Sequence, residues 1–291
     1  MTRNTIGAVV VTFKRPIQLV KTLEAILEQG ILQKHIWVIN NDIGDKLEIV
    51  RTLFPEINIF QSMKNIASAG GFSLGMIKIF QCGLEWAWLF NDDSRPIGGS
   101  LDSILDHAET LDQPDAGMVK LANLNKRGEA VLQYWNGRRL PAYVPVSQKL
   151  IATDLVTFDA CLVSVKMISE IGTCDPGYFM GTYEFDYCLL AKDHGFQIYT
   201  IPNGMIEDEK SGSIGGTPPW RQYYNTRNHL HLGIKRKDTG IIWAWMVREA
   251  KFTYSILRFQ DQKLKRLKLK FYAFFHAMVG IRGKVFDPEN S

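Results

Sequence analysis

The 291-residue chain has little of what several protein classes require. It contains four cysteines, which form no Cys-x-x-Cys pair and no close spacing typical of a metal site. Disulfide-stabilised secreted proteins and zinc fingers depend on such pairs, so we expect reduced, buried thiols in a cytosolic protein. No apolar run reaches the ~18 residues of a membrane-spanning helix. The amino terminus shows no signal-peptide pattern and leads directly into an apolar run.

Common nucleotide and metal motifs are also missing. No Walker-type Gly-x-x-x-x-Gly-Lys-Ser/Thr is present. The pattern Gly70-Gly71-x-x-x-Gly75 lacks the spacing of a dinucleotide fingerprint and follows the third strand-like run, not the first. The six histidines form no zincin-type motif. A P-loop nucleotidase, a dinucleotide-dependent dehydrogenase and a zincin protease are therefore disfavoured.

The composition is that of a soluble globular protein, with 46% apolar and 22% charged residues. The length suits one large domain, or one domain with an appendage. The net charge of +4 is mild, but the last third of the chain is rich in Lys and Arg.

Strand-like and helical patterns alternate through the first third of the chain. Apolar runs typical of buried strands occupy residues 6–13, 36–39, 57–60 and 84–91. Helical periods occupy residues 17–29, 47–53 and 72–83. This alternation predicts an α/β fold with a mostly parallel sheet covered by helices on both faces.

The remaining two thirds are less regular. We expect helices over 101–111 and 183–193, and strands over 117–121 and 196–201, with a strand pair or a bent strand over 155–165. Residues 125–150 look turn-rich, and the polar, Gly- and Pro-containing residues 207–219 predict a mobile loop. From Trp220 the pattern is helical nearly to the end.

The most informative segment is the apolar run that ends abruptly in Asn91, Asp92 and Asp93. A buried strand of this kind delivers polar side chains to the edge of an α/β sheet, where ligands bind. Two adjacent carboxylates there either bind a hard divalent cation or repel each other. A cation that also bridges phosphates would explain the arrangement. The alternative is an Asp-rich turn closed by Pro96.

A second pair of carboxylates, Glu184 and Asp186, begins the helix predicted over 183–193. A carboxylate at a loop-to-helix junction is a natural general base, because the helix fixes it while it stays open to a cleft. Acidic residues also favour a helix amino terminus through its dipole, and this alternative remains open.

Two further segments carry polar groups with two interpretations each. Residues 207–213 would close over a ligand and lend a carboxylate to a metal, or they form a solvated loop. Arg227, one helical turn past Tyr223 and Tyr224, would hold a phosphate or a sugar hydroxyl. Otherwise this segment is an amphipathic helix with its aromatic side chains in the core.

A basic amphipathic helix is predicted near residues 256–278. Its apolar stripe consists of Leu264, Leu267, Phe271, Phe274 and Met278. Its basic side chains are Lys263, Lys265, Arg266, Lys268 and Lys270. Such a helix suits an anionic membrane surface; the alternative is a helix packed on the main domain with a solvated basic side. The carboxylate-rich centre of the chain argues against nucleic-acid binding.

Four segments in order give the chain a resemblance to the inverting family 2 glycosyltransferases of the GT-A fold, in particular to bacterial galactofuranosyltransferases and related rhamnosyltransferases. Residues 9–16 resemble the opening nucleotide-binding strand, and residues 65–72 resemble the Asn-x-Gly-x-Ala-Gly-Gly-Phe loop. Residues 86–96 resemble the metal-binding Asp-x-Asp segment, and residues 224–228 resemble the Tyr-x-x-Arg-Asn ending. The resemblance implies a GT-A domain over residues 1–232, with a Rossmann-like sheet, and a basic C-terminal helical region over 233–291.

The resemblance also implies roles for individual residues. Asp93 would ligate Mn or Mg together with Asn91, and Asp208 stands where the family often has a metal-binding histidine. Glu184 falls at the position of the catalytic base, with Asp186 as the other candidate. The nucleotide-sugar donor site would be formed by Thr12, Phe13, Arg15, Asn40, Asn65, Gly70, Gly71, Asn91, Asp92 and Arg227.

The chain departs from the family pattern at several of these positions. Asn91 replaces the first Asp of Asp-x-Asp, which would weaken metal binding. Ala67 replaces a usual Gly, and Tyr183-Glu184 stands where many members have Glu-Asp.

We therefore expect a metal-dependent, inverting hexosyltransferase that moves galactofuranose from UDP-galactofuranose to a lipid-linked glycan acceptor in bacterial surface polysaccharide (O-antigen) synthesis. The alternatives are a rhamnosyltransferase that uses dTDP-rhamnose and a catalytically inactive GT-A protein that binds glycans. The expected location is cytoplasmic, peripheral on the inner face of the cytoplasmic membrane. No nucleic-acid partner is expected, and the oligomeric state is left open.

Overall fold

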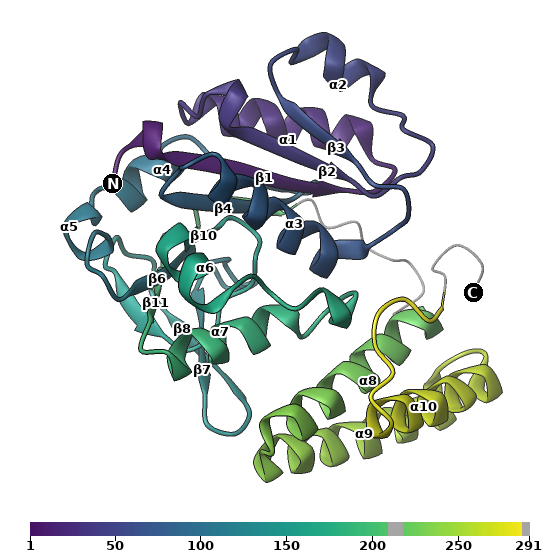
Figure 1. Cartoon of the computed structure of the whole chain (residues 1–291). Helices are drawn as coiled ribbons and strands as arrows, with labels where there is room; N and C mark the ends of the chain where they lie inside the picture. The colour runs from purple at the N-terminus through teal and green to yellow at the C-terminus, as the bar shows by residue number, and fades with distance from the viewer. Residues whose placement is uncertain (209–217, 287–291) are drawn as a thin grey trace.

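The computed structural model describes residues 1–208 and 218–286 and is built around an eight-stranded sheet (Figure 1). Strand β10 runs antiparallel to both β4 and β6, and β9 runs antiparallel to β11, whereas the other six strands share one direction. The predicted mostly parallel sheet is thus confirmed. In spatial order the strands are β3 (Asn58–Gln61), β2 (Ile36–Asn40), β1 (Ile6–Thr12), β4 (Trp86–Asn91), β10 (Cys161–Ser164), β6 (Ala116–Leu121), β11 (Gln197–Ile201) and β9 (Ile151–Thr153).

Helices cover both faces of this sheet, because alternate side chains of its buried strands point to opposite faces. In β1, Val9 and Val11 pack toward α3 (Ala67–Gln81), α6 (Val165–Ile171) and α7 (Tyr183–Asp193). Ala8 and Val10 pack toward α1 (Pro16–Glu28), α2 (Glu48–Leu53) and α4 (Ser100–Leu105). The remaining short helices are α5 (Ala108–Leu111) and the 3-10 turns Arg3–Thr5, Gln33–His35 and Pro176–Tyr178.

Glycines let α3 approach the sheet closely. A Cβ atom at Gly75 would lie 2.1 Å from Val9 Cγ1, and one at Gly71 would lie 2.6 Å from Val11 Cγ1. Such distances are far inside van der Waals contact, so these positions require glycine. The Gly-rich segment therefore fixes the amino terminus of α3 beside the end of β1.

Three expectations for the middle of the chain were wrong. Residues 125–150 contain a β-hairpin, β7 (Ala130–Trp135) and β8 (Arg139–Val144), and not only turns. Pro141 within β8 argued against a strand, but a two-stranded sheet has edges that tolerate it. Only residues 161–164 of the stretch 155–165 are extended into a strand, and the helix expected over 101–111 divides into α4 and α5.

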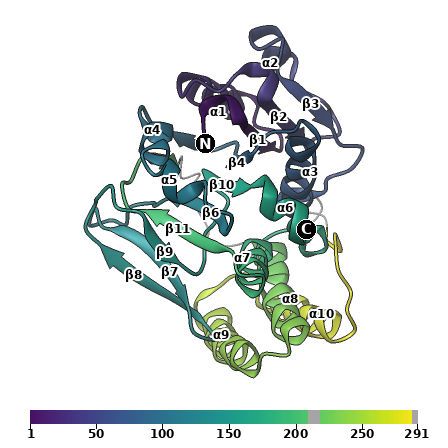
Figure 2. The same ribbon diagram turned by 60° about the vertical axis from the view of Figure 1, so that its left-hand side comes forward.

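The C-terminal part consists of the helices α8 (Pro219–Arg236), α9 (Thr239–Phe259) and α10 (Lys263–Met278), which lie side by side beyond α7 (Figure 2). The expectation of a single helix near 256–278 is wrong. The helix is interrupted at residues 260–262, where Gln262 adopts the left-handed region at φ 47°. The expected domain boundary at residue 232 falls within α8, and the division stays a prediction.

Helix α10 packs on α8 through small or aliphatic residues, and not through its predicted apolar stripe. Leu269, Ala273 and Ala277 are buried, whereas Leu264 is 85% and Phe271 67% exposed. Most of the apolar stripe of α10 is therefore exposed, whereas Phe274 stacks on Trp245 of α9 with ring centroids 6.0 Å apart. None of the described helices is both long and apolar enough to cross a membrane.

Candidate active site

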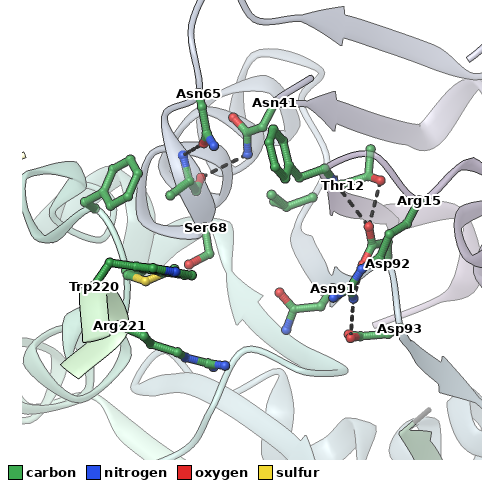
Figure 3. A pocket seen from close by; sticks show the side chains of 15 residues that line it. Thr12, Arg15, Asn41, Asn65, Ser68, Asn91, Asp92, Asp93, Trp220 and Arg221 are labelled. Carbon is green, nitrogen blue, oxygen red and sulfur yellow. Dashed lines mark hydrogen bonds and ion pairs between the residues drawn. The ribbon is translucent and has the colours of Figure 1, made fainter. Parts of the chain in front are cut away.

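A cavity of 540 Å³ opens at the carboxyl ends of β1 and β4 (Figure 3). This is the edge of an α/β sheet at which ligands generally bind. Its lining comes from the loop after β1, the end of β2, the start of α3, the end of β4, the loop before α7 and the start of α8. The lining residues are Val11, Thr12, Phe13, Arg15, Asn41, Asn65, Ala67, Ser68, Asn91, Asp92, Asp93, Phe179, Met180, Trp220 and Arg221.

Asp92 is buried and holds the loop after β1. Its Oδ2 accepts hydrogen bonds from Thr12 Oγ1 at 2.7 Å and from the Phe13 N–H at 3.3 Å. Its Oδ1 lies 3.3 Å from Arg15 Nη1. Burial raises the pKa of the Asp92 carboxyl to about 6, against the lowering effects of Thr12 and Arg15. Asp92 thus positions Thr12, Phe13 and Arg15 around the cavity.

Asp93 and Asn91 present oxygen atoms that fit a divalent cation. Asp93 Oδ2 accepts from Arg15 Nη1 at 2.6 Å, so this carboxylate already faces a positive charge. In the part of the chain that the structure describes, no three His, Cys, Asp or Glu residues cluster to hold an ion unaided. Magnesium, however, is usually bound by one or two carboxylates completed by substrate phosphates and water. The donor set fits a cation that arrives with a diphosphate.

Asp208 comes close to this pair through a small second sheet. Strand β12 (Ile206–Asp208) pairs antiparallel with β5 (Ser94–Pro96), and Asp208 lies opposite Ser94. The chain thereby brings the third predicted metal residue beside Asp93 across more than a hundred positions of sequence. The side chain of Asp208 and most of the loop predicted over 207–219 lie outside the described residues.

The amino terminus of α3 forms another wall of the cavity. Asn65 Oδ1 accepts from the Ala67 N–H at 2.8 Å, and Asn41 Nδ2 donates to the Ala67 carbonyl at 3.1 Å. Ala67 adopts φ 52°, in the left-handed region that favours glycine. The first turn of this 15-residue helix thus faces the cavity with its positive dipole end, which suits an anionic ligand.

The wall that adjoins the start of α3 was not predicted; here the Ala69 N–H donates to the Phe179 carbonyl at 3.1 Å. Phe179 and Met180 come from the loop before α7, and Trp220 and Arg221 from the first turn of α8 (Figure 3). The sequence signal was weak, because an aromatic and a basic residue after Pro218-Pro219 resemble an ordinary helix start. Asn41 and Ser68 were also not predicted, although Asn41 adjoins Asn40 and Ser68 lies within the matched segment 65–72.

Arg227 supports this wall and does not line the cavity. It is 1% exposed, and its Nη2 donates to the Tyr178 carbonyl at 3.0 Å. Asn228 Nδ2 donates to the Met180 carbonyl at 2.6 Å. The Tyr-x-x-Arg-Asn segment therefore holds the loop that carries Phe179 and Met180.

Glu184 is partly exposed, but its carboxyl group is packed among protein atoms at the start of α7. Its Oε1 accepts from the Phe158 N–H at 2.8 Å. Burial raises the pKa of this carboxyl to about 7; Asp159 adds to the increase, whereas Lys120 and Arg139 oppose it. A carboxylate with a pKa near neutrality has the property that a general base needs.

Asp186, two residues along the same helix, has a different environment. It is buried, and its Oδ2 accepts from Lys235 Nζ at 2.6 Å, which joins α7 to α8. Neither Glu184 nor Asp186 lines the first cavity. Tyr183, directly before Glu184, lies near Ser68, which does line it.

The predicted donor site is thus assembled in part. Thr12, Phe13, Arg15, Asn65, Asn91 and Asp92 meet in the cavity, together with Asp93. Asn40 Nδ2 donates to Gln61 Oε1, and Asn40 Oδ1 accepts from the Asp42 N–H. Gly70 packs against Ile66. Asn40, Gly70, Gly71 and Arg227 therefore do not line it.

Curated relatives were found by sequence. The chain is 38% identical over 189 residues to the galactofuranosyltransferase GlfT1 of Mycobacterium tuberculosis, a match that covers 61% of this chain and 61% of that protein. It is 35% identical over 183 residues to GlfT1 of Mycolicibacterium smegmatis, with 60% of each chain covered. The match therefore spans less than two thirds of these relatives. No family model matches the chain.

Solved structures share the fold at low sequence identity. GalNAc-T7, in a structure with UDP, GalNAc and Mn²⁺, gives a TM-score of 0.61 at 13% identity over 79% of this chain and 47% of that chain. Staphylococcus aureus TarS (1–349) gives 0.57 at 11% identity over 94% and 80%. The mannosyltransferase PcManGT of Pyrobaculum calidifontis, in complex with GDP-Man and Mn²⁺, gives 0.52 at 13% identity over 96% and 87%. The chain therefore has the GT-A fold and, over the matching part, is similar in sequence to the galactofuranosyltransferase GlfT1.

Proposed function

We propose that this protein is a metal-dependent glycosyltransferase that moves galactofuranose from UDP-galactofuranose to a saccharide acceptor. The observation that carries the proposal is the cavity in which Asp93 and Asn91 face the amino terminus of α3. A carboxylate suited to a cation and a positive helix end, set around one cavity, fit the two charged parts of a metal-bound diphosphate. The homology to GlfT1 supports galactofuranose as the sugar.

In this proposal the residues around the cavity bind and orient the donor. Asp93, Asn91 and Asp208 would hold Mn or Mg, which would neutralise charge on the leaving diphosphate. Arg15, which donates to Asp93, would contact the diphosphate if a cation took this carboxylate. Asn65 and Ser68 offer polar groups near the α3 end, and Trp220 lines the cavity together with them.

Glu184 is proposed as the general base and Asp186 as a positioning residue. The Glu184 carboxylate takes the proton of an acceptor hydroxyl, whose oxygen forms a bond to the anomeric carbon. The bond from that carbon to the diphosphate breaks, and its electron pair leaves on the diphosphate. One displacement of this kind inverts the anomeric configuration.

The proposed acceptor is lipid-linked, which places the protein on the inner face of the cytoplasmic membrane. The exposed apolar side chains of α9 and α10, among them Trp243, Leu264 and Phe271, support a contact with lipid. Of the five basic residues predicted to contact the membrane, two form ion pairs within the protein. Arg266 is bound to Asp261 and Lys270 to Glu249. Lys263, Lys265 and Lys268 are exposed and are the proposed contacts with anionic lipid.

The donor is tested by thermal shift with UDP and with dTDP, each with Mn²⁺ and with EDTA. Because a ligand that binds only the folded state stabilises it, UDP with Mn²⁺ should raise the melting temperature most. A larger shift with dTDP would favour the rhamnosyl alternative. No shift with any nucleotide would favour the inactive glycan-binding alternative, for which Asn91 in place of an acid is the main argument.

A further inference from the structure

A second cavity, of 370 Å³, lies beneath the β7–β8 hairpin. Lys120 of β6 and Thr200 of β11 pair in register at its floor, near the carboxyl ends of these parallel strands. Lys120 points to the same face of the sheet as Met118, the face covered by α7. This cavity is therefore on the same side of the sheet as α7 and its residue Glu184.

Direct contacts connect Glu184 to this second cavity. The Phe158 N–H that donates to Glu184 lies between Thr157 and Asp159, and both of these line the cavity. Arg139, also in the lining, stacks its guanidinium over the ring of Phe185, 5.4 Å from the centroid. Tyr183 lies near Ser68 of the first cavity, so the start of α7 is close to the walls of both cavities.

The lining of the second cavity suits a hydroxyl-rich ligand. Gln133 Oε1 is buried and accepts no hydrogen bond from any described side chain or backbone group. A buried acceptor of this kind is costly unless a ligand or water donates to it. Arg139 and Asp159 add a donor and an acceptor, and Val131, Leu155 and Val156 supply an apolar side for the carbon face of a sugar ring. The volume lies within the usual range for small-ligand pockets.

We propose that the second cavity binds the accepting sugar of the acceptor saccharide, with Gln133 and Arg139 as specificity-determining residues. This inference rests on the proposed function, because it uses Glu184 as the base that connects the two sites. It explains why the base does not line the donor cavity: Glu184 meets the acceptor hydroxyl from the acceptor side. Gln133 Oε1 receives a ligand hydroxyl proton, and Arg139 donates to a ligand oxygen.

The test uses the full chain and octyl β-galactofuranoside as the probe. Its binding is measured by saturation-transfer NMR, and its glycosylation by the release of UDP from UDP-galactofuranose. Gln133→Leu and Arg139→Met should each weaken probe binding and raise its KM about tenfold, because each leaves one buried or stacked polar contact unmade. The KM for UDP-galactofuranose should stay within about twofold.

Arg138→Met is the matched control, because Arg138 is the exposed neighbour of Arg139 and does not line this cavity. It should leave probe binding unchanged. The acceptor site would be overturned if the Gln133→Leu and Arg139→Met variants both bound the probe as tightly as the wild type. It would also be overturned if the wild-type chain did not bind the probe. If the wild type bound the probe, and both variants bound it more weakly, but the wild type did not hydrolyse UDP-galactofuranose, the result would instead count against the proposed donor chemistry.

Discussion

The replacement of Glu184 by Gln gives a direct test of the general base. Gln keeps the size of the side chain and can still accept the hydrogen bond from the Phe158 N–H, but it cannot take a proton. General-base catalysis typically contributes 10²–10⁴-fold, so turnover should fall by at least about 10²-fold while UDP still binds. Turnover is followed by UDP release with saturating acceptor.

The pH dependence should report the same group. Burial raises the pKa of Glu184 to about 7, and the charges that face it are Asp159, Lys120 and Arg139. The base acts only when deprotonated, so turnover should fall as the pH drops through about 7 and reach roughly a tenth of its plateau one pH unit lower. Lys120→Met removes a positive charge that favours the carboxylate, so it should move this limb to higher pH.

Asp186→Asn serves as the comparison. It removes the partner of Lys235 and should lower the melting temperature, but it should keep the position of the acidic limb. A Glu184→Gln enzyme with full turnover, together with an inactive Asp186→Asn enzyme of normal fold, would show that the two carboxylates had been assigned in the wrong order. A flat pH profile between 5.5 and 8 would refute the argument from the pKa of Glu184.

Three further outcomes follow from the site and its supports. Asp93→Ala should abolish Mn²⁺-dependent UDP binding in calorimetry with an unchanged circular dichroism spectrum; unchanged affinity would remove Asp93 from the metal site. Binding to anionic vesicles should fall with added salt and fall again when Lys263, Lys265 and Lys268 become Gln, since each basic residue near the surface contributes about 1 kcal/mol. Co-sedimentation that ignores both changes would contradict the membrane contact. Gly75→Ala should lower stability by about 1–3 kcal/mol in urea unfolding, because its Cβ would overlap Val9 Cγ1; an unchanged midpoint would mean that α3 moves away freely.

The sheet and its ligand edge could be predicted from the sequence because they depend on local patterns. Continuous apolar runs marked β1 and β4, and the polar residues at their ends, Thr12 and Asn91 to Asp93, are brought together by parallel pairing alone. The likeness to known motifs added Asp208, which no local pattern connects to Asp93. Its placement depends on the antiparallel pairing of β12 with β5.

The parts that could not be predicted depend on long-range packing. Trp220 and Arg221 reach the cavity because α8 packs against the loop before α7. Arg227 and Asn228 of α8 fix this contact by donating to carbonyl groups of that loop. The periodicity of α10 showed an apolar stripe but could not show which face would pack. The small residues Ala273 and Ala277 allow a closer approach to α8 than the aromatic stripe would, and most of the stripe is left exposed.

The most direct test of the central claim is the release of UDP from UDP-galactofuranose by the full chain, measured in Mn²⁺ and in EDTA against dTDP-rhamnose as the competing donor. The account predicts turnover that needs the cation, prefers UDP-galactofuranose and is lost in Asp93→Ala. A wild-type chain that folds and binds UDP but turns over neither donor, with or without an acceptor saccharide, would contradict it.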